Sequence, residues 1–150
     1  MALRPAFDLQ PFAVTLVNAT SDAVVYADAE GQIRYWNAGA RRMFGYTADE
    51  ALGQSLDIII PASLRSRHWE GYRKTMRTGA TRYGAGDILA VPAARKDGSR
   101  ISVEFSITPF RDASGAMLGI AAIMRDVTVR FEEMKALRQR AERAPDQSGA

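Results

Sequence analysis

The 150-residue sequence contains no cysteine. Disulfide bonds, thiolate metal sites and thiol-dependent catalysis are therefore excluded, and the composition is compatible with a cytoplasmic protein. The sequence also lacks an apolar run near the roughly 20 residues that a membrane-spanning helix needs. Its first residues contain neither the apolar stretch nor the small-residue cleavage site of a secretory signal. From these absences we expect a cytoplasmic domain without a membrane segment.

Charge of one sign is not in large excess either. The chain has 20 Lys and Arg residues against 17 Asp and Glu residues, a net charge of +3. The basic residues are spread along the chain, and their density rises only between Arg65 and Arg82 and near the C-terminus. A nucleic-acid-binding domain gathers such residues into one stripe. The sequence therefore favours a mixed, solvated surface and predicts no nucleic-acid partner.

The composition, with 47% hydrophobic and 25% charged residues, is typical of a single globular domain. Apolar spacing and turn residues predict strands at 23–27, 33–37, 87–94, 101–107 and 117–124. Helices are expected at 12–19, 38–44, 48–52, 62–78 and 127–143. Because hairpins stand at both ends and strands do not alternate with helices, we expect an antiparallel sheet with helices on one face, class α+β.

Several residues occupy positions that begin or end these helices. Asn37, Thr47 and Thr128 each precede or open a predicted helix and are expected to cap it. Glu50, three residues after Thr47, completes the pattern of a capping box. Gly45 is expected to end the helix that Asn37 begins, because a residue without Cβ tolerates a positive φ.

Five segments of the chain resemble, in order, the motifs of the PAS domain family. They are Ser21–Val25, Gly31–Ala40, Phe44–Gly53, Arg95–Ser99 and Asp126–Thr128. The third has Asp49 where the family has a Glu, and the resemblance covers about residues 12–128. It implies a five-stranded antiparallel sheet in the strand order 2-1-5-4-3, with helices packed on one face. It also implies signalling by ligand binding or dimerisation rather than catalysis.

The resemblance divides the chain into three parts: a flexible arm at 1–11, a PAS sensor domain with an N-terminal flanking helix at 12–128, and a C-terminal signalling helix with a disordered tail at 129–150. In the last part, Phe131, Met134 and Leu137 recur every three residues. This spacing suits a parallel coiled coil with a second copy of the chain, or a helix folded back on its own domain. Because so short a seam cannot hold a homodimer alone, the N-terminal helix is expected to help. A downstream signalling protein or output domain is the other expected partner.

His68 is the only histidine and lies in the predicted helix at 62–78. Counting by three and four places it in one stripe of that helix, formed by Leu64, His68, Gly71, Tyr72, Thr75 and Gly79. We expect this stripe to face the sheet, with Gly71 leaving room beside the imidazole. A neutral imidazole that faces an apolar cavity is suited to bind haem iron.

The same helix resembles that of the haem-bearing PAS sensors of oxygen-sensing histidine kinases and phosphodiesterases. The segment Ile60–Arg65 precedes His68, and Gly79 follows it, in the arrangement of those sensors. The resemblance implies haem b as the cofactor, with His68 as the ligand of the iron. The residues expected around the cofactor are His68, Tyr72, Ile88, Leu89, Phe105 and Ile107.

The distal side departs from the oxygen sensors, which place an Arg or a Met there. The matching segment, Gly84–Leu89, contains neither, so an apolar distal wall is expected. Bound dioxygen depends on a distal hydrogen-bond donor more than carbon monoxide or nitric oxide does. We therefore expect a sensor of the latter two gases, or of redox state. Arg82 or Tyr83 could still supply a donor, and the arginines of this region could pair with the haem propionates.

Another interpretation stays open, a haem-free PAS module for dimerisation or protein interaction. Its pocket would be empty or would hold a small metabolite or a flavin. The absence of cysteine excludes only the flavin photochemistry that forms a bond to a cysteine. An enzyme is not expected, because one histidine and acidic residues scattered over turns supply neither a nucleophile–base pair nor metal-ligand spacing.

Overall fold

The computed structural model describes residues 4–80 and 88–144. Its centre is a five-stranded antiparallel sheet in the order β2-β1-β5-β4-β3, which confirms the expected topology. The strands are β1 Ala23–Asp28, β2 Ile33–Trp36, β3 Leu89–Ala94, β4 Arg100–Arg111 and β5 Met117–Asp126. The strand expected at 87–94 begins at Leu89, and position 87 itself lies outside the described residues.

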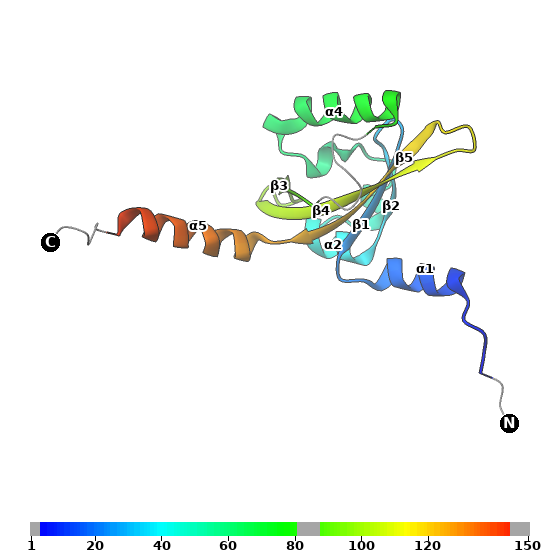
Figure 1. Cartoon of the computed structure of the whole chain (residues 1–150), viewed down its shortest axis with the longest axis horizontal. Coiled ribbons are helices and arrows are strands. Elements are labelled where there is room, and N and C mark those ends of the chain that lie inside the picture. Colours follow the sequence, from blue (N-terminus) through cyan, green and yellow to red (C-terminus); the bar gives the residue numbers. More distant parts are fainter. Residues whose placement is uncertain (1–3, 81–87, 145–150) are drawn as a thin grey trace.

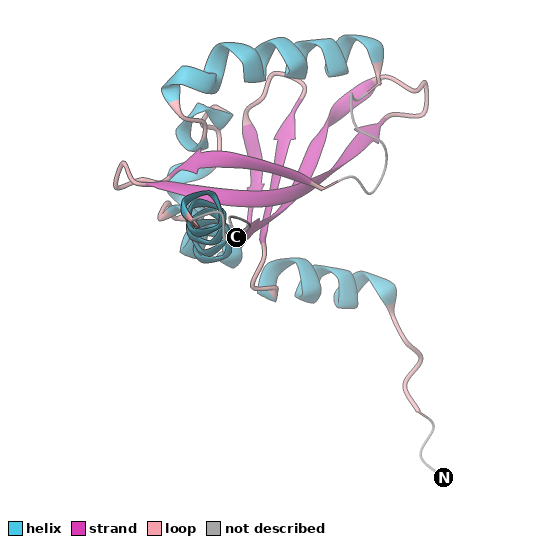
Figure 2. Cartoon of the chain, turned by 60° about the vertical axis from the view of Figure 1, so that its left-hand side comes forward, coloured by secondary structure: helices cyan, strands magenta, loops and turns pink. Residues whose placement is uncertain are grey.

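The helices cover one face of this sheet, as Figure 2 shows. They are α2 Ala38–Phe44, α3 Ala48–Ala51 and α4 Arg65–Thr78, with short 3₁₀ turns η1 Leu56–Ile59 and η2 Ala62–Leu64. Two more helices flank the domain, α1 Leu9–Ala19 and α5 Thr128–Arg143. Figure 1 shows α1 and α5 extending away from the body in different directions. Among the described residues, no helix has the length and apolarity that crossing a membrane requires.

The core lies between the helices and the inner face of the sheet. On β4, Ile101 and Val103 point into the core and are 7% and 2% exposed. Phe105 packs on the same cluster and is half-buried. From α2, Phe44 is fully buried against the ring of Trp36, with the ring centroids 5.5 Å apart. Burial of these apolar side chains is the main force that holds the helical layer on the sheet.

Two boundaries differ from the sequence-based expectation. Helix α1 begins at Leu9, because the Asp8 carboxylate accepts a hydrogen bond from the Gln10 N–H and caps it. Part of the expected flexible arm is therefore helical. The helix expected from position 62 starts with the 3₁₀ turn η2, and α4 proper begins at Arg65.

The prediction that Thr128 caps the terminal helix is wrong. Thr128 is the first residue of α5, and its hydroxyl accepts a hydrogen bond from the Ser102 N–H at 3.0 Å. The Val127 N–H donates to the Ser102 carbonyl at 2.8 Å. The Asp126 carboxylate accepts a hydrogen bond from the Thr128 N–H at 2.9 Å. The two bonds to Ser102 fasten the start of α5 to β4.

The predicted caps of α2 and α3 are confirmed. Thr47 and Glu50 form a capping box on α3. Gly45 ends α2 with a φ of +86°. Asn37 caps α2 by accepting a hydrogen bond from the Ala40 N–H at 2.9 Å.

The Asn37 side chain also joins segments that are distant in the sequence. Its Oδ1 accepts from the Val24 N–H at 2.8 Å, in addition to the capping bond. Its Nδ2 donates to the Val17 carbonyl at 2.9 Å and to the Asp22 carbonyl at 3.0 Å. The residue is 4% exposed, so these four bonds replace water that the amide would otherwise need.

We expect Asn37→Ala to lower the free energy of unfolding by about 3 kcal/mol, because buried backbone groups lose their partners. Urea denaturation at neutral pH measures the loss. Asn18→Ala is the control, because Asn18 is exposed and its only described side-chain bond is to the Tyr35 hydroxyl. This control should lose less than about 1 kcal/mol, and equal losses in the two variants would contradict the role given to Asn37.

Candidate functional site

Helix α4 packs on the core through Trp69, Tyr72 and Met76, which recur at the spacing of one helix face. The stripe expected from the sequence included Tyr72, which does face the core, but it left out Trp69 and Met76 and counted Gly71 as inward-facing. Gly71 is exposed with open space around it, so it does not leave room beside the imidazole. The difference arises because burying the large Trp69 ring stabilises the fold more than burying a glycine, which has no side chain.

The β1–β2 turn fixes this orientation of α4. The Trp69 ring lies over Gly31, so closely that a Cβ at that glycine would overlap the ring. The Trp69 Nε1 donates to the Asp57 carboxylate at 2.6 Å. One turn further on, the Tyr72 hydroxyl donates to the Asp28 carbonyl at 2.6 Å. Burial raises the pKa of Tyr72, so its hydroxyl stays a protonated donor.

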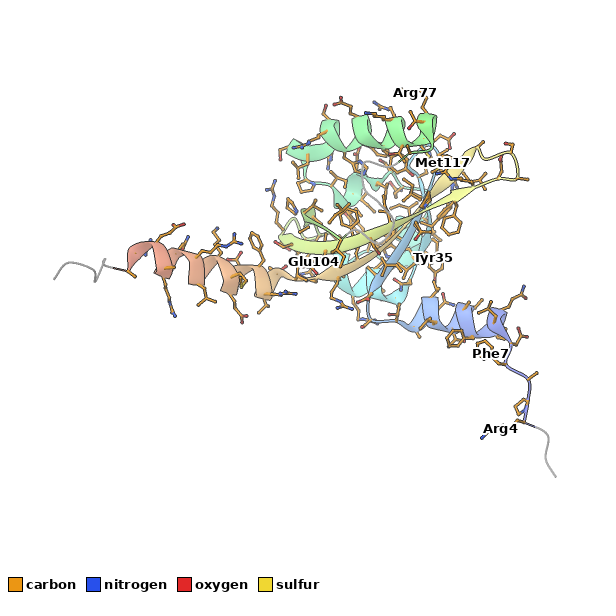
Figure 3. All side chains as sticks on the ribbon, in the orientation of Figure 1. Arg4, Phe7, Tyr35, Arg77, Glu104 and Met117 are labelled. Carbon is orange, nitrogen blue, oxygen red and sulfur yellow. The ribbon has the colours of Figure 1, made fainter. Side chains whose placement is uncertain are left out.

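The outer face of α4 is charged. Arg67, Arg73, Lys74 and Arg77 are all exposed. Figure 3 shows Arg77 pointing away from the sheet at the C-terminal end of the helix. These side chains confirm that the inner and outer faces of the helix are clearly separated.

His68 lies at the flank of the inner face and is half-buried. Its ring is edge-on to Trp69, with centroids 4.8 Å apart, and 5.8 Å from the ring of Tyr72. Its Nδ1 is buried and has no hydrogen-bond partner among the residues that the structure describes. Burial lowers the pKa of His68, and the nearby Asp57 carboxylate offsets only part of that effect. At neutral pH the imidazole is therefore uncharged and carries a lone pair.

The other residues expected around the cofactor fall into two groups. Leu89 and Phe105 are directly opposite each other in the β3–β4 register, and Ile107 follows on the same face of β4. All three are half-buried. Ile88, by contrast, stands just before the first residue of β3 and is 70% exposed, so it is not part of the core. The distal candidates Arg82 and Tyr83, and positions 84–87, lie outside the described residues.

Sequence reasoning missed the contributions of Asp57 and Trp69. The carboxylate of Asp57 holds the Trp69 indole and lies 3.9 Å from the Arg65 guanidinium. The spacing of Trp69, Tyr72 and Met76 was a signal that could have revealed the inner face. No local pattern marks Asp57, because it reaches Trp69 from the separate turn η1.

Of the surface clefts among the described residues, one borders α4 and another borders α2, and His68 lines neither of these two. One has a volume of about 320 Å³ and is lined by Ala29, Glu30, Trp69, Tyr72 and Arg73. The other, of about 370 Å³, lies between α2 and the ends of β1 and β5 and is lined by Ser21, Asp22, Gly39, Arg42, Met43, Arg125 and Asp126. The first cleft borders the inner face of α4, next to Tyr72.

The donor set fits haem better than a metal ion bound only by protein. Within residues 4–80 and 88–144, no cluster of three or more His, Asp or Glu side chains could hold an ion. Zinc sites need three or four such ligands, whereas haem iron needs one imidazole from the protein. The uncharged His68, with a buried nitrogen that has no described partner, matches that requirement.

The family model described as the PAS fold matches residues 17–132, so the chain belongs to the PAS domain family. It is a sensor domain of the kind found in signalling proteins. Sensor protein FixL of Bradyrhizobium diazoefficiens is 30% identical over 76% of this chain and 22% of that protein. Oxygen sensor protein DosP of Escherichia coli K12 is 28% identical over 77% of this chain and 14% of that protein. The chain thus spans less than a quarter of these relatives.

The fold has close counterparts among solved structures. The PAS domain of a protein from Colwellia psychrerythraea aligns with a TM-score of 0.70 and 21% identity. The alignment covers 81% of this chain and 98% of that one. This likeness supports the fold, including the sheet order and the flanking helices.

A pair of glycine variants tests the position of α4. Gly31 and Gly53 have φ values of +79° and +82°, but only Gly31 lies against a side chain, the Trp69 ring. We expect Gly53→Ala to cost about 1 kcal/mol of unfolding free energy, because only the backbone is strained. Gly31→Ala should cost roughly 2 kcal/mol more, because it also displaces Trp69. Equal losses in urea denaturation would show that Trp69 does not rest on this turn.

The lowered pKa of His68 predicts how the stability of the ligand-free protein depends on pH. Because folding holds the pKa of His68 below its ordinary value of 6.5, the fold favours the neutral imidazole. That contribution is complete above pH 6.5 and is lost as the pH falls through the folded-state pKa. We expect the free energy of unfolding to fall more between pH 7.5 and 5 in the wild type than in His68→Gln. Identical slopes in urea denaturation would contradict the assignment, since the chain has no other histidine.

Proposed function

We propose that this domain is a haem-based sensor in which His68 binds the iron of haem b. The observation that carries the proposal is the half-buried, uncharged imidazole whose Nδ1 has no partner among the described residues. When bound, haem supplies an iron centre that takes a diatomic gas or changes its redox state. The relative named as an oxygen sensor supports gas sensing as the class of function.

The chain's own residues set the preference among ligands. Leu89, Phe105 and Ile107 present apolar side chains on the inner face of β3 and β4. Such a wall offers no hydrogen bond to bound dioxygen, so carbon monoxide and nitric oxide are favoured. Tyr72 holds α4 in place and does not supply a hydrogen bond to a bound gas, because its hydroxyl already donates to the Asp28 carbonyl.

We propose further that the domain works as a parallel homodimer and passes its signal through α5 to a downstream protein or output domain. Exposed apolar side chains lie along both flanking helices. On α1 they are Leu9, Phe12, Val14 and Leu16, and on α5 they are Val129, Phe131, Met134 and Leu137. Because α5 is exposed from Val129 onward, it does not fold back on its own domain. A second copy would cover both sets of side chains.

The second candidate function is a haem-free module for dimerisation or protein interaction, with a pocket that is empty or holds a metabolite or flavin. The packing of Tyr72 favours it. This side chain is 8% exposed and occupies the space between α4 and the sheet. A haem group would have to share or displace that space.

An absorption spectrum of protein produced with a haem precursor distinguishes the two candidates. We expect a strong Soret band that is lost in His68→Ala and retained in Thr75→Ala, a half-buried position two turns along the same flank. Titration with carbon monoxide, nitric oxide and dioxygen should show the first two bound and dioxygen bound weakly, because the distal wall is apolar.

Other outcomes have clear meanings. A Soret band retained in His68→Ala would place the iron ligand on another residue and contradict the site. A colourless protein that takes up no added haemin, yet sediments as a dimer, would favour the haem-free module. Tight dioxygen binding would contradict the apolar distal wall.

A further inference from the structure

Helix α1 ends and helix α5 begins at the same end of two neighbouring inner strands of the sheet, β1 and β5. Strands β1 and β5 are antiparallel neighbours, with Ala23 opposite Met124. The chain therefore enters the sheet from α1 beside the point where it leaves for α5. Figure 1 shows the two helices diverging from this edge. A contact between these two strand ends can therefore influence the orientation of α1 relative to α5.

Such a contact is present between Asp22, just before β1, and Arg125, near the end of β5. The Arg125 Nε and one terminal nitrogen each lie 3.3 Å from a different oxygen of the Asp22 carboxylate. This two-point geometry fixes the guanidinium plane relative to the carboxylate. The Arg125 side chain is 70% exposed and that of Asp22 25% exposed.

Asp22 is joined firmly to the end of α1. Its carbonyl accepts from the Asn37 amide, and the same amide holds the Val17 carbonyl in the last turn of α1. The Tyr35 hydroxyl bonds to Asn18 in that turn as well. A movement of α1 would therefore move Asp22 with it.

Arg125 has a second acidic neighbour on its other side. Glu104 of β4 is its direct partner in the β4–β5 register, and Figure 3 labels it near the point where β5 runs into α5. Strand β4 also holds the first residues of α5, through Ser102. The cleft of about 370 Å³ beside Asp22 and Arg125 leaves open space around the guanidinium.

We propose that Arg125 couples α1 to α5 by exchanging between Asp22 and Glu104. Paired with Asp22, it joins the end of β5 to the segment between α1 and β1. Paired with Glu104, it binds only within the sheet, and the last turn of α1 is then held by its bonds to Asn37 and Tyr35 alone. An exposed ion pair shifts such an equilibrium by no more than about fivefold. The contact therefore sets helix orientation with little effect on the stability of the fold, and it does so without any dependence on haem.

Double electron–electron resonance on the full chain tests the coupling. The absence of native cysteine permits clean spin labels at Gln10→Cys on α1 and Gln139→Cys on α5, both exposed positions. Labelled chain is diluted with excess unlabelled chain, so that distances within one chain dominate. We expect one main distance in the parent. In Asp22→Asn and Arg125→Gln the fraction outside that peak should rise, by up to about fivefold.

Three further variants make the result specific. Glu104→Gln should sharpen the main peak, because it removes the alternative partner. Arg34→Gln, which breaks the separate 2.7 Å pair with Asp28, should leave the distribution unchanged. The double variant Asp22→Arg with Arg125→Asp should restore the parent distribution. Circular dichroism confirms that each variant is folded.

The proposal is overturned if both Asp22→Asn and Arg125→Gln superimpose on the parent distribution. It is equally overturned if Arg34→Gln broadens the distribution as much as they do, because the effect would then be general. Broadening by Glu104→Gln would show that Arg125 does not exchange between the two carboxylates.

Discussion

The buried amide of Asn37 is the interaction on which the rest of the structure depends. Burying an amide without partners costs several kcal/mol, so its four hydrogen bonds must all be made together. Making them brings the end of α1, the start of β1 and the start of α2 to one point. The pairing of β1 with β5 then begins from a fixed position. The position of α1 against the sheet follows from this one side chain.

Helix α4 is positioned by a second, separate constraint, the contact of Trp69 with the turn at Gly31. A glycine is needed there twice over, because φ is positive and because the indole leaves no space for a Cβ. Once Trp69 and Tyr72 are held at the β1–β2 turn, His68 must lie at the flank of the inner face. Its buried Nδ1, which has no hydrogen-bond partner among the described residues, lowers the stability of the fold. Such costs are expected where a site serves function rather than stability.

Features set by local sequence could be predicted from the sequence. The strand order, the caps at Asn37 and Thr47 and the end of α2 at Gly45 were all foreseen, because each depends on neighbouring residues or on a familiar motif. The rotation of α4 was not, because it depends on the contact of Trp69 with Gly31, and that glycine is distant from the helix in the sequence. The role of Thr128 was missed for the same reason, since its partner Ser102 lies on another strand.

A continuous chain of contacts links the candidate site to helix α5. Tyr72 of α4 bonds to the carbonyl of Asp28 at one end of β1, and Asp22 stands at the other end of the same strand. Asp22 meets Arg125, which lies within three residues of the first turn of α5. Contiguity alone does not transmit a signal, because coupling requires an element with two arrangements that both sites can bias. Along this route, Arg125 stands between two carboxylates, so it is the point at which a displacement of β1 can become a change in α5.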